Sequence, residues 1–220
     1  MTPYYADDLV TIYHARCEDV LPSIDPAEVG LLLTDPPYGM GYQHGARKGG
    51  VTLGADGIDI AGDDEPFDPA HLLAMGVPTV LWGGNHYADR LPASPGWIVW
   101  DKRDGRPAND QSDVELAWTN ITRTARAFSR YWSGAVRGGT DQGLGKVHVS
   151  QKPTALMAWI IERWTEPGDL VLDPYMGSGP VAQACHELGR RYIGIELVED
   201  YCRIAVSRLS QQTFDFGGVA

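Results

Sequence analysis

Two short motifs in the sequence combine residue types that could act on bound ligands. Residues 34–39 read Thr-Asp-Pro-Pro-Tyr-Gly, and residues 173–179 read Asp-Pro-Tyr-Met-Gly-Ser-Gly. The first motif places a carboxylate, a proline carbonyl and an aromatic ring side by side. The second holds glycines that let a ligand approach backbone N–H groups. The two motifs therefore predict one group that grips a polar substrate and one loop that binds an anionic or carboxylate-bearing cofactor.

The first motif suits the chemistry of an exocyclic amine on a nucleic-acid base. Pro36 and Pro37 fix the backbone after an apolar run, so the Asp35 carboxylate and the Pro36 carbonyl should point rigidly out of the strand end, beside Tyr38. Two acceptors can hold both N–H groups of the amine and stabilise the positive charge that develops on its nitrogen during attack. The Tyr38 ring would stack on the base. The plainer alternative is a Pro-Pro turn with a solvated aspartate, which fits two prolines alone better than it fits this hexapeptide.

The second motif lies between a predicted strand at 170–172 and a predicted helix at 180–188. It matches neither GxGxxG nor GxxxxGK[ST], which disfavours nicotinamide and ATP. Glu196 ends the next predicted strand, about 20 residues beyond Gly177, and an acid there is the usual partner of ribose hydroxyls. The combination predicts an adenosine-type ligand. A plain turn with a surface glutamate explains either piece alone, but explains both poorly at this spacing.

The elements that must position these motifs form an alternating pattern in the C-terminal third. Helices are predicted at 154–164, 180–188 and 199–209, with strands at 170–172 and 191–195, and this order implies parallel strands with helical crossovers. Further predicted elements are strands at 29–34, 79–82, 97–100 and 114–118 and a short helix that begins after Asp68-Pro69 and ends at Gly76. A length of 220 residues fits a single α/β domain, residues 1–220. The glycine-rich stretch 39–62 is predicted to be a mobile functional loop or a disordered one.

The charge is distributed unevenly along the chain. A net charge of −11 argues against indiscriminate nucleic-acid binding, yet residues 101–150 carry eight basic and six acidic side chains. A solvated face is the commoner explanation of such a run when it stands alone. Together with the first motif, it indicates a short basic segment at 120–150 that faces nucleic acid.

Composition excludes several other classes of protein and site. No apolar run approaches the roughly 18 residues of a membrane span, and the first residues lack a signal sequence, so we expect a soluble cytoplasmic protein. Cys17, Cys185 and Cys202 are scattered and lack metal-ligand spacing, so we predict reduced core cysteines and no metal site. None of them follows a proline, which disfavours thiol-dependent methylation of a cytosine ring carbon.

The two motifs, in this chain order, resemble those of the DNA amino-methyltransferases, which use S-adenosylmethionine and in one permuted class carry the catalytic motif before the cofactor motif. The segments His-Val-Ser-Gln-Lys-Pro at 148–153 and Gly-Arg-Arg-Tyr-Ile-Gly-Ile-Glu at 189–196 also resemble that family. The resemblance extends over residues 7–209. Within the family, the chain is similar to short, phage-like members. It implies a Rossmann-like methyltransferase fold: a doubly wound, mostly parallel sheet with helices on both faces, in which the two motif-bearing strands are neighbours.

The resemblance also implies roles for individual residues. The catalytic and base-gripping residues would be Asp35, Pro36, Pro37 and Tyr38. The methionine end of S-adenosylmethionine would be held by Asp173, Pro174, Tyr175, Gly177, Ser178 and Gly179, with support from Gln151 and Lys152 at its carboxylate, and the ribose by Glu196. DNA contacts are predicted for Arg47, Lys48, Arg123, Arg126, Arg130, Arg137 and Lys146.

The chain departs from the family pattern in three places. Tyr175 stands where many relatives carry Phe, and Arg16 stands where relatives often carry Asp, which leaves the contact to the cofactor adenine open. The short segment 120–150 leaves little room for a target-recognition domain. Sequence specificity is then either low, or read by a homodimer or by the 39–62 loop.

The leading functional hypothesis is an adenine-specific DNA methyltransferase that transfers methyl directly to N6 of a flipped base, in a bacterial or phage-infected cell. The nearest alternative is N4 methylation of cytosine, since both targets are exocyclic amines; Asp rather than Ser before Pro-Pro-Tyr favours adenine within the family. A non-catalytic cofactor-binding scaffold is disfavoured by the intact Asp35. An RNA or protein-amide methyltransferase is disfavoured because relatives acting on protein amides typically carry Asn at that position.

Overall fold

The computed structural model describes residues 1–39, 64–107, 112–133, 136–137 and 152–212. The chain forms two compact units, which we name for their place in the sequence. The terminal unit comprises Met1–Thr34 and Gln151–Ala220, and the central unit comprises Asp35–Ser150. The single domain expected from the chain length stays a prediction.

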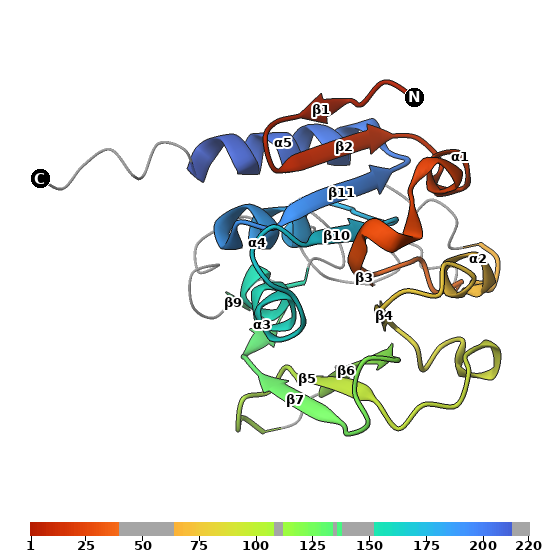
Figure 1. The fold of residues 1–220 in the computed structure, drawn as a ribbon. Helices are drawn as coiled ribbons and strands as arrows, with labels where there is room; N and C mark the ends of the chain where they lie inside the picture. The colour runs from red at the N-terminus through yellow and green to blue at the C-terminus, as the bar shows by residue number, and fades with distance from the viewer. Residues whose placement is uncertain (40–63, 108–111, 134–135, 138–151, 213–220) are drawn as a thin grey trace, which may run out of the picture. The chain divides into compact units, whose positions relative to one another are not determined.

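The terminal unit is built on a mostly parallel sheet with the strand order β1-β2-β11-β10-β3 (Figure 1). Strand β10 pairs in parallel with both β3 and β11, β11 pairs in parallel with β2, and only β1 of these described strands is antiparallel to its neighbour. The strands are β1 (Tyr5–Ala6), β2 (Val10–His14), β3 (Val29–Thr34), β10 (Leu170–Asp173) and β11 (Arg191–Glu196). Parallel pairing brings the carboxyl ends of β3, β10 and β11 to one edge of the sheet.

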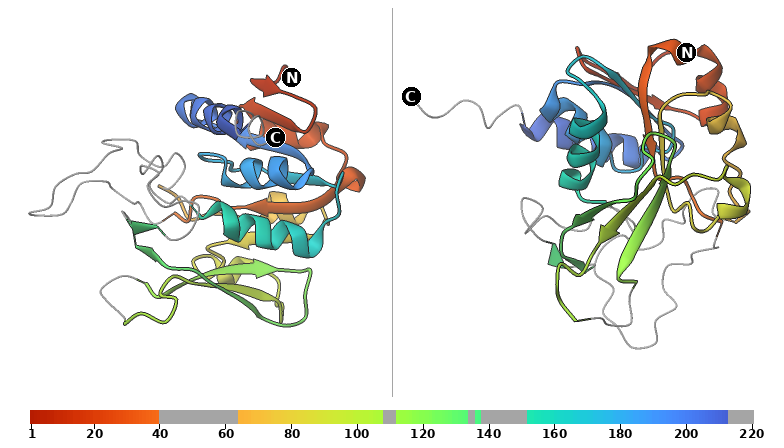
Figure 2. Two further views of the ribbon diagram at one scale, coloured as in Figure 1. Left: turned by 90° about the vertical axis from the view of Figure 1, so that its left-hand side faces the viewer. Right: turned by 60° about the horizontal axis from the view of Figure 1, so that its bottom comes forward.

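Helices lie on both faces of this sheet. On one face α3 (Thr154–Trp164) packs against α4 (Pro180–Leu188), and α4 packs against α5 (Glu199–Gln212); the short α1 (Cys17–Val20) contacts β11 on the opposite face (Figure 2). The 3-10 turns η1 (Leu21–Ser23) and η2 (Pro26–Glu28) lead from α1 into β3. The predicted α/β, doubly wound, Rossmann-like architecture is confirmed.

The local sequence explains these elements. Strand β3 is almost entirely apolar and lies buried, as expected of a strand covered on both faces, and the prolines that follow it cannot extend its hydrogen bonding. Helix α4 begins with Pro180 directly after Gly179 and ends at Leu188 directly before Gly189, both glycines having positive φ. This is the usual asymmetry of proline at the first helical position and glycine after the last.

The central unit has a mixed sheet with the strand order β4-β6-β5-β7. Strand β6 is antiparallel to both β4 and β5, whereas β7 runs parallel to β5, as the yellow-green arrows in Figure 1 show. The described elements are α2 (Ala70–Leu73), β4 (Thr79–Trp82), η3 (Ala88–Arg90), β5 (Trp97–Asp101), β6 (Val114–Thr119), β7 (Arg126–Ser129) and the two-stranded ribbon β8 (Trp132–Ser133) with β9 (Val136–Arg137).

The predicted elements agree closely with these bounds. The helices at 154–164 and 180–188 are found as predicted, and the last helix continues to Gln212. The sequence did not predict β2 or β7, because neither Val-Thr-Ile-Tyr-His nor Arg-Ala-Phe-Ser is a continuous apolar run. It also did not predict the short elements β1, α1, β8 and β9. Of the predicted loop at 39–62, all but residue 39 lies outside the described residues. None of the described helices is long and apolar enough to cross a bilayer.

Candidate cofactor and catalytic sites

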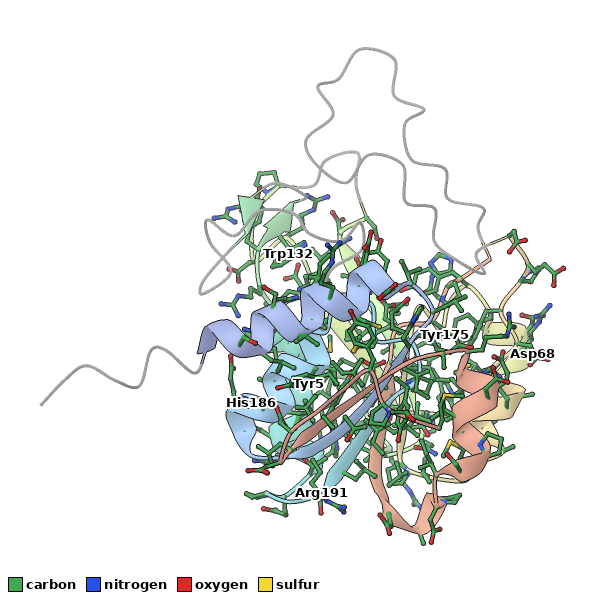
Figure 3. All side chains as sticks on the ribbon, turned by 90° about the horizontal axis from the view of Figure 1, so that it is seen from above. Tyr5, Asp68, Trp132, Tyr175, His186 and Arg191 are labelled. Carbon is green, nitrogen blue, oxygen red and sulfur yellow. The ribbon has the colours of Figure 1, made fainter. Side chains whose placement is uncertain are left out.

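The glycine loop of the terminal unit joins β10 to α4 at the carboxyl edge of the sheet. Figure 3 labels Tyr175, in this loop, and Arg191, the first residue of β11, and shows them at opposite ends of the strands. Gly177 and Gly179 both have positive φ, and a Cβ added to Gly179 would come within 2.8 Å of the Ala205 Cβ on α5. Glycine is therefore required at position 179 both by the turn and by the close approach of α5.

Asp173, the last residue of β10, stabilises this loop through buried hydrogen bonds. Only 1% of its surface is exposed, and its two carboxylate oxygens accept hydrogen bonds from Thr34 Oγ1 at 2.7 Å and from Tyr192 Oη at 3.2 Å. Thr34 Oγ1 in turn accepts a hydrogen bond from the Tyr175 backbone N–H at 3.1 Å. One buried carboxylate thus ties the ends of β3 and β10 to a residue near the start of β11, and burial together with the charge of Asp173 raises the pKa of Tyr192 well above its ordinary value.

Glu196 reaches the loop from the end of β11. Its Oε2 accepts a hydrogen bond from the Gly177 N–H at 2.8 Å, and its Oε1 accepts one from the Val198 N–H at 2.7 Å. Burial raises the pKa of this carboxyl above its ordinary value, although the backbone amides act in the opposite direction by favouring the charged form. Each carboxylate oxygen has a second lone pair, so Glu196 can accept from two hydroxyls of a ligand while it holds the loop.

Tyr175 is held by a residue from the other end of the chain. Cys17 Sγ donates a hydrogen bond to Tyr175 Oη at 3.3 Å. Burial raises the pKa of the Cys17 thiol to about 11 and also raises that of Tyr175. The hydroxyl that distinguishes Tyr175 from the family's Phe therefore has a partner on α1. Arg16, the other departure nearby, is exposed and forms an ion pair with Glu18 at 3.5 Å.

The remaining cofactor-binding predictions fall on the same unit. Pro174 and Ser178 are buried within the loop, and Lys152, which precedes α3, is 3% exposed. Gln151 lies outside the described residues. Glu196, Gly177 and Tyr175 therefore lie around one loop, and their roles toward the cofactor stay predictions. Cys17 on α1 and Arg208 on α5, which donates to the Ser178 carbonyl, contact the same loop without having been predicted as site residues.

In the central unit, the Asp-Pro-Pro-Tyr motif forms a small cluster of its own. Tyr38 Oη donates a hydrogen bond to Asp35 Oδ1 at 2.5 Å. The Tyr38 ring stacks on the His86 imidazole, with a centroid separation of 4.8 Å and an interplanar angle of 14°. A Cβ on Gly83, which has φ +72°, would overlap the Tyr38 ring. The tyrosine is thus held flat against a glycine and a histidine, and it orients the carboxylate of Asp35.

Gly83 and His86 were not among the predicted site residues. The signal that could have found them is Trp-Gly-Gly-Asn-His at 82–86, directly after β4, because paired glycines at the end of a strand often mark a close approach. Of the predicted residues of the motif, Pro36 is buried, and Asp35, Pro37 and Tyr38 are half-buried.

Comparison with known proteins identifies the family. The sequence model of the N6/N4 methyltransferase family, described as DNA methylase, matches residues 81–207. The putative methylase YubD of Escherichia coli (strain K12) is 30% identical over 210 residues, which cover 88% of this chain and 87% of YubD. The chain belongs to the DNA methylase family. Type II methyltransferase M2.DpnII of Streptococcus pneumoniae is a further relative of this chain. The two are 23% identical over 96% of this chain and 93% of M2.DpnII.

Solved structures agree with the fold of this DNA methylase. The M1.HpyAVI–SAM complex matches with a TM-score of 0.55 and 23% identity, covering 91% of this chain and 99% of its own. PvuII DNA methyltransferase, which is cytosine-N4-specific, matches with a TM-score of 0.61 and 14% identity. The match covers 99% of this chain and 90% of the PvuII enzyme. At these identities the likeness supports the Rossmann-like fold and carries no further detail.

The basic residues predicted to contact DNA are described only in part in this methylase. Arg123 and Arg126 are exposed, the latter on β7, and Arg130 is half-buried. Arg47, Lys48 and Lys146 lie outside the described residues, as does the side chain of Arg137 on β9. Arg106 makes a cation–π contact within the protein, its guanidinium carbon lying 3.5 Å from the centroid of the Tyr131 ring. Within the described parts, no cluster of three or more His, Cys, Asp or Glu side chains could hold a metal ion.

Proposed function

We propose that the chain transfers the methyl group of S-adenosylmethionine to N6 of adenine in DNA, by direct attack and without a covalent enzyme intermediate. Membership of the DNA methylase family is the broad support. The single observation that carries the proposal is the Asp35 carboxylate, fixed by Tyr38 in an Asp-Pro-Pro-Tyr sequence.

The residues of the terminal unit fit such a donor. Glu196 has lone pairs for the two ribose hydroxyls, and the loop at 177–179 leads into the N-terminus of α4, where the helix dipole favours the carboxylate of the methionine moiety. The buried Lys152 ammonium adds a positive charge for the same carboxylate, with Gln151 beside it in sequence. When bound, S-adenosylmethionine supplies an activated methyl group and departs as S-adenosylhomocysteine.

The residues of the central unit act on the amine. The Asp35 carboxylate and the Pro36 carbonyl accept the two N–H groups of the base, which directs the nitrogen lone pair toward the methyl group and stabilises the positive charge on nitrogen. As the N–C bond forms, the S–C bond breaks, and one amine proton then leaves to Asp35 or to water. Tyr38 stacks on the base and keeps Asp35 oriented.

The DNA base must leave the duplex to reach these groups, at a cost of a few kcal/mol. Contacts from Arg123, Arg126 and Arg130 to the phosphate backbone would offset that cost, together with Arg47, Lys48, Arg137 and Lys146. Because the chain has a net charge of −11, its contacts with DNA phosphates depend on local basic side chains such as these. Reading of the target sequence by a homodimer is part of this proposal.

Mass spectrometry of digested DNA tests the proposal directly. Purified protein is incubated with S-adenosylmethionine and unmethylated DNA, with RNA in a parallel reaction, and the nucleosides are analysed. We expect N6-methyladenine in DNA. Detection of N4-methylcytosine without N6-methyladenine would reject adenine as the target and favour N4 methylation of cytosine, which the N6/N4 family also includes. Donor binding without any methylated nucleoside in DNA would favour the scaffold instead.

A further inference from the structure

Arg208, on α5, makes a set of contacts that the proposed mechanism does not use. Its Nη1 donates to the Ser178 carbonyl at 3.0 Å and approaches Ser178 Oγ at 3.4 Å. Its Nη2 donates to Gln183 Oε1 at 2.7 Å and approaches Thr154 Oγ1 at 3.4 Å. One guanidinium therefore reaches the glycine loop, α4 and α3 at once.

Two of the three residues that accept hydrogen bonds from Arg208 are shielded from water. Ser178 is 2% exposed and Thr154 is 5% exposed, and Thr154 Oγ1 also donates to Gln183 Oε1 at 3.1 Å. A planar guanidinium with several fixed donors can serve acceptors on separate elements, whereas an ammonium on a flexible stem matches that geometry less well. The contacts thus depend on arginine rather than on positive charge alone.

Two of the residues that Arg208 contacts lie in or directly beside the segments proposed to hold the methionine end of the donor. Ser178 lies between Gly177 and Gly179 in the loop, and Thr154 follows Lys152 by two positions. The carbonyl of Ser178 and the N–H of Gly179 share one peptide plane, so a bond to that carbonyl also fixes where the N–H points. The Gly179 N–H itself donates to Met176 O at 3.1 Å, which closes the turn.

Glu196 holds the same loop from β11. It accepts the N–H of Gly177, one residue before the carbonyl that Arg208 binds. Two consecutive residues of the loop are thereby held by side chains of opposite charge from different elements. Losing Arg208 would release the part of the loop nearest α4 while leaving the Glu196 side in place.

We propose that Arg208 is a positioning residue for the methionine end of the donor subsite. It sets the peptide plane at Ser178–Gly179 and the start of α3, and through them the groups that face the donor's carboxylate. The inference rests on the proposed use of S-adenosylmethionine, and it concerns a residue just beyond the segment 81–207 that the family model matches.

Two ligands that differ only at the methionine end test this role. S-Adenosylhomocysteine carries the amino-acid moiety, and 5′-methylthioadenosine keeps the adenosine but lacks it. In Arg208→Met, calorimetric titration of the full chain should show about tenfold weaker binding of S-adenosylhomocysteine, as expected for lost charged hydrogen bonds, with the binding of 5′-methylthioadenosine changed by less than about twofold. Arg208→Lys should fall between Arg208→Met and the original protein.

The matched control is Arg203→Met on the same helix. Arg203 is exposed and pairs only locally, with Asp200 at 2.7 Å, so both ligands should bind as before. If both ligands bind equally more weakly to Arg208→Met and Arg208→Lys, Arg208 only supports the fold in general, and the inference is wrong. Unchanged binding of both ligands would also overturn it. If the unmutated protein binds neither ligand, the proposed donor itself is wrong, which separates failure of the proposed function from failure of this inference.

Discussion

The terminal and central units hold their functional side chains in different ways. In the terminal unit, the carboxylates of Asp173 and Glu196 are both tied to residues of neighbouring strands or of the glycine loop. In the central unit, Asp35 is oriented by Tyr38, which rests on its contacts with His86 and Gly83. Donor binding should therefore depend on buried hydrogen bonds, and action on the substrate should depend on the packing of one aromatic ring.

One substitution in each unit should give the largest difference between an effect on methyl transfer and an effect on donor binding. Asp35→Ala should lower methyl transfer by about 10³-fold, because it removes the acceptor that stabilises charge in the transition state, while donor binding stays within about twofold. Glu196→Ala should instead weaken donor binding. Transfer rates with saturating DNA and calorimetric titration of S-adenosylhomocysteine measure the two effects. Undiminished transfer by Asp35→Ala would refute its catalytic role.

Gly83→Ala tests the packing of the central unit without touching Asp35. An added Cβ would overlap the Tyr38 ring, so the ring and the carboxylate bonded to it must shift, and transfer should fall by about 100-fold. Gly105→Ala is the matched control, because Gly105 also has positive φ, of +78°, but its added Cβ meets no atom within 4 Å. Equal losses in both variants would mean that backbone strain, rather than displacement of Tyr38, causes the effect.

Tyr192→Phe sharpens the description of the terminal unit. It removes the hydroxyl that donates to Asp173 Oδ2 and leaves a buried carboxylate with one donor fewer, so the free energy of unfolding should fall by about 2 kcal/mol. Urea unfolding followed by circular dichroism measures the change. Tyr4→Phe, at an exposed position, should have an effect within about 0.5 kcal/mol. A stable Tyr192→Phe variant would show that this contact contributes little.

The three cysteines should react slowly in the folded protein and play no part in transfer. Burial raises the pKa of Cys17 to about 11, that of Cys202 to about 12 and that of Cys185 well above its ordinary value. A raised thiol pKa lowers the reactive thiolate fraction at pH 8, so iodoacetamide should label the folded protein at least about 100-fold more slowly than the urea-unfolded chain. Labelling should accelerate as the pH approaches 11. Rapid labelling at pH 8 with loss of transfer would contradict both the burial and the thiol-independent mechanism.

Much of the terminal unit was predictable because its signals are local. Proline and glycine mark both ends of α4, and the run 29–34 is apolar throughout, so these elements follow from short-range rules. The contact of Glu196 with the glycine loop was predictable because one helix and one strand separate the two by a characteristic spacing. The amphipathic β2 was missed, since its five residues show too few alternations to stand out from a loop.

Contacts between distant parts of the sequence were not predictable in the same way. Cys17 and Tyr175 lie 158 positions apart, and Arg208 meets Thr154 across 54 positions, and nothing in either local sequence indicates the partner. His86 under Tyr38 is a similar case within the central unit. Such pairs depend on how strands and helices pack, and they decide how the motifs are oriented.

Thr34 connects the glycine loop, through hydrogen bonds, with the start of the Asp-Pro-Pro-Tyr motif, through the chain. Its hydroxyl donates to Asp173 and accepts the N–H of Tyr175, and one peptide bond joins it to Asp35. Ordering of the glycine loop by the donor should therefore be transmitted along the chain to the start of the catalytic motif. This connection favours a compulsory sequence of events in which the donor is loaded before DNA. Product-inhibition kinetics with S-adenosylhomocysteine distinguish that order from random binding.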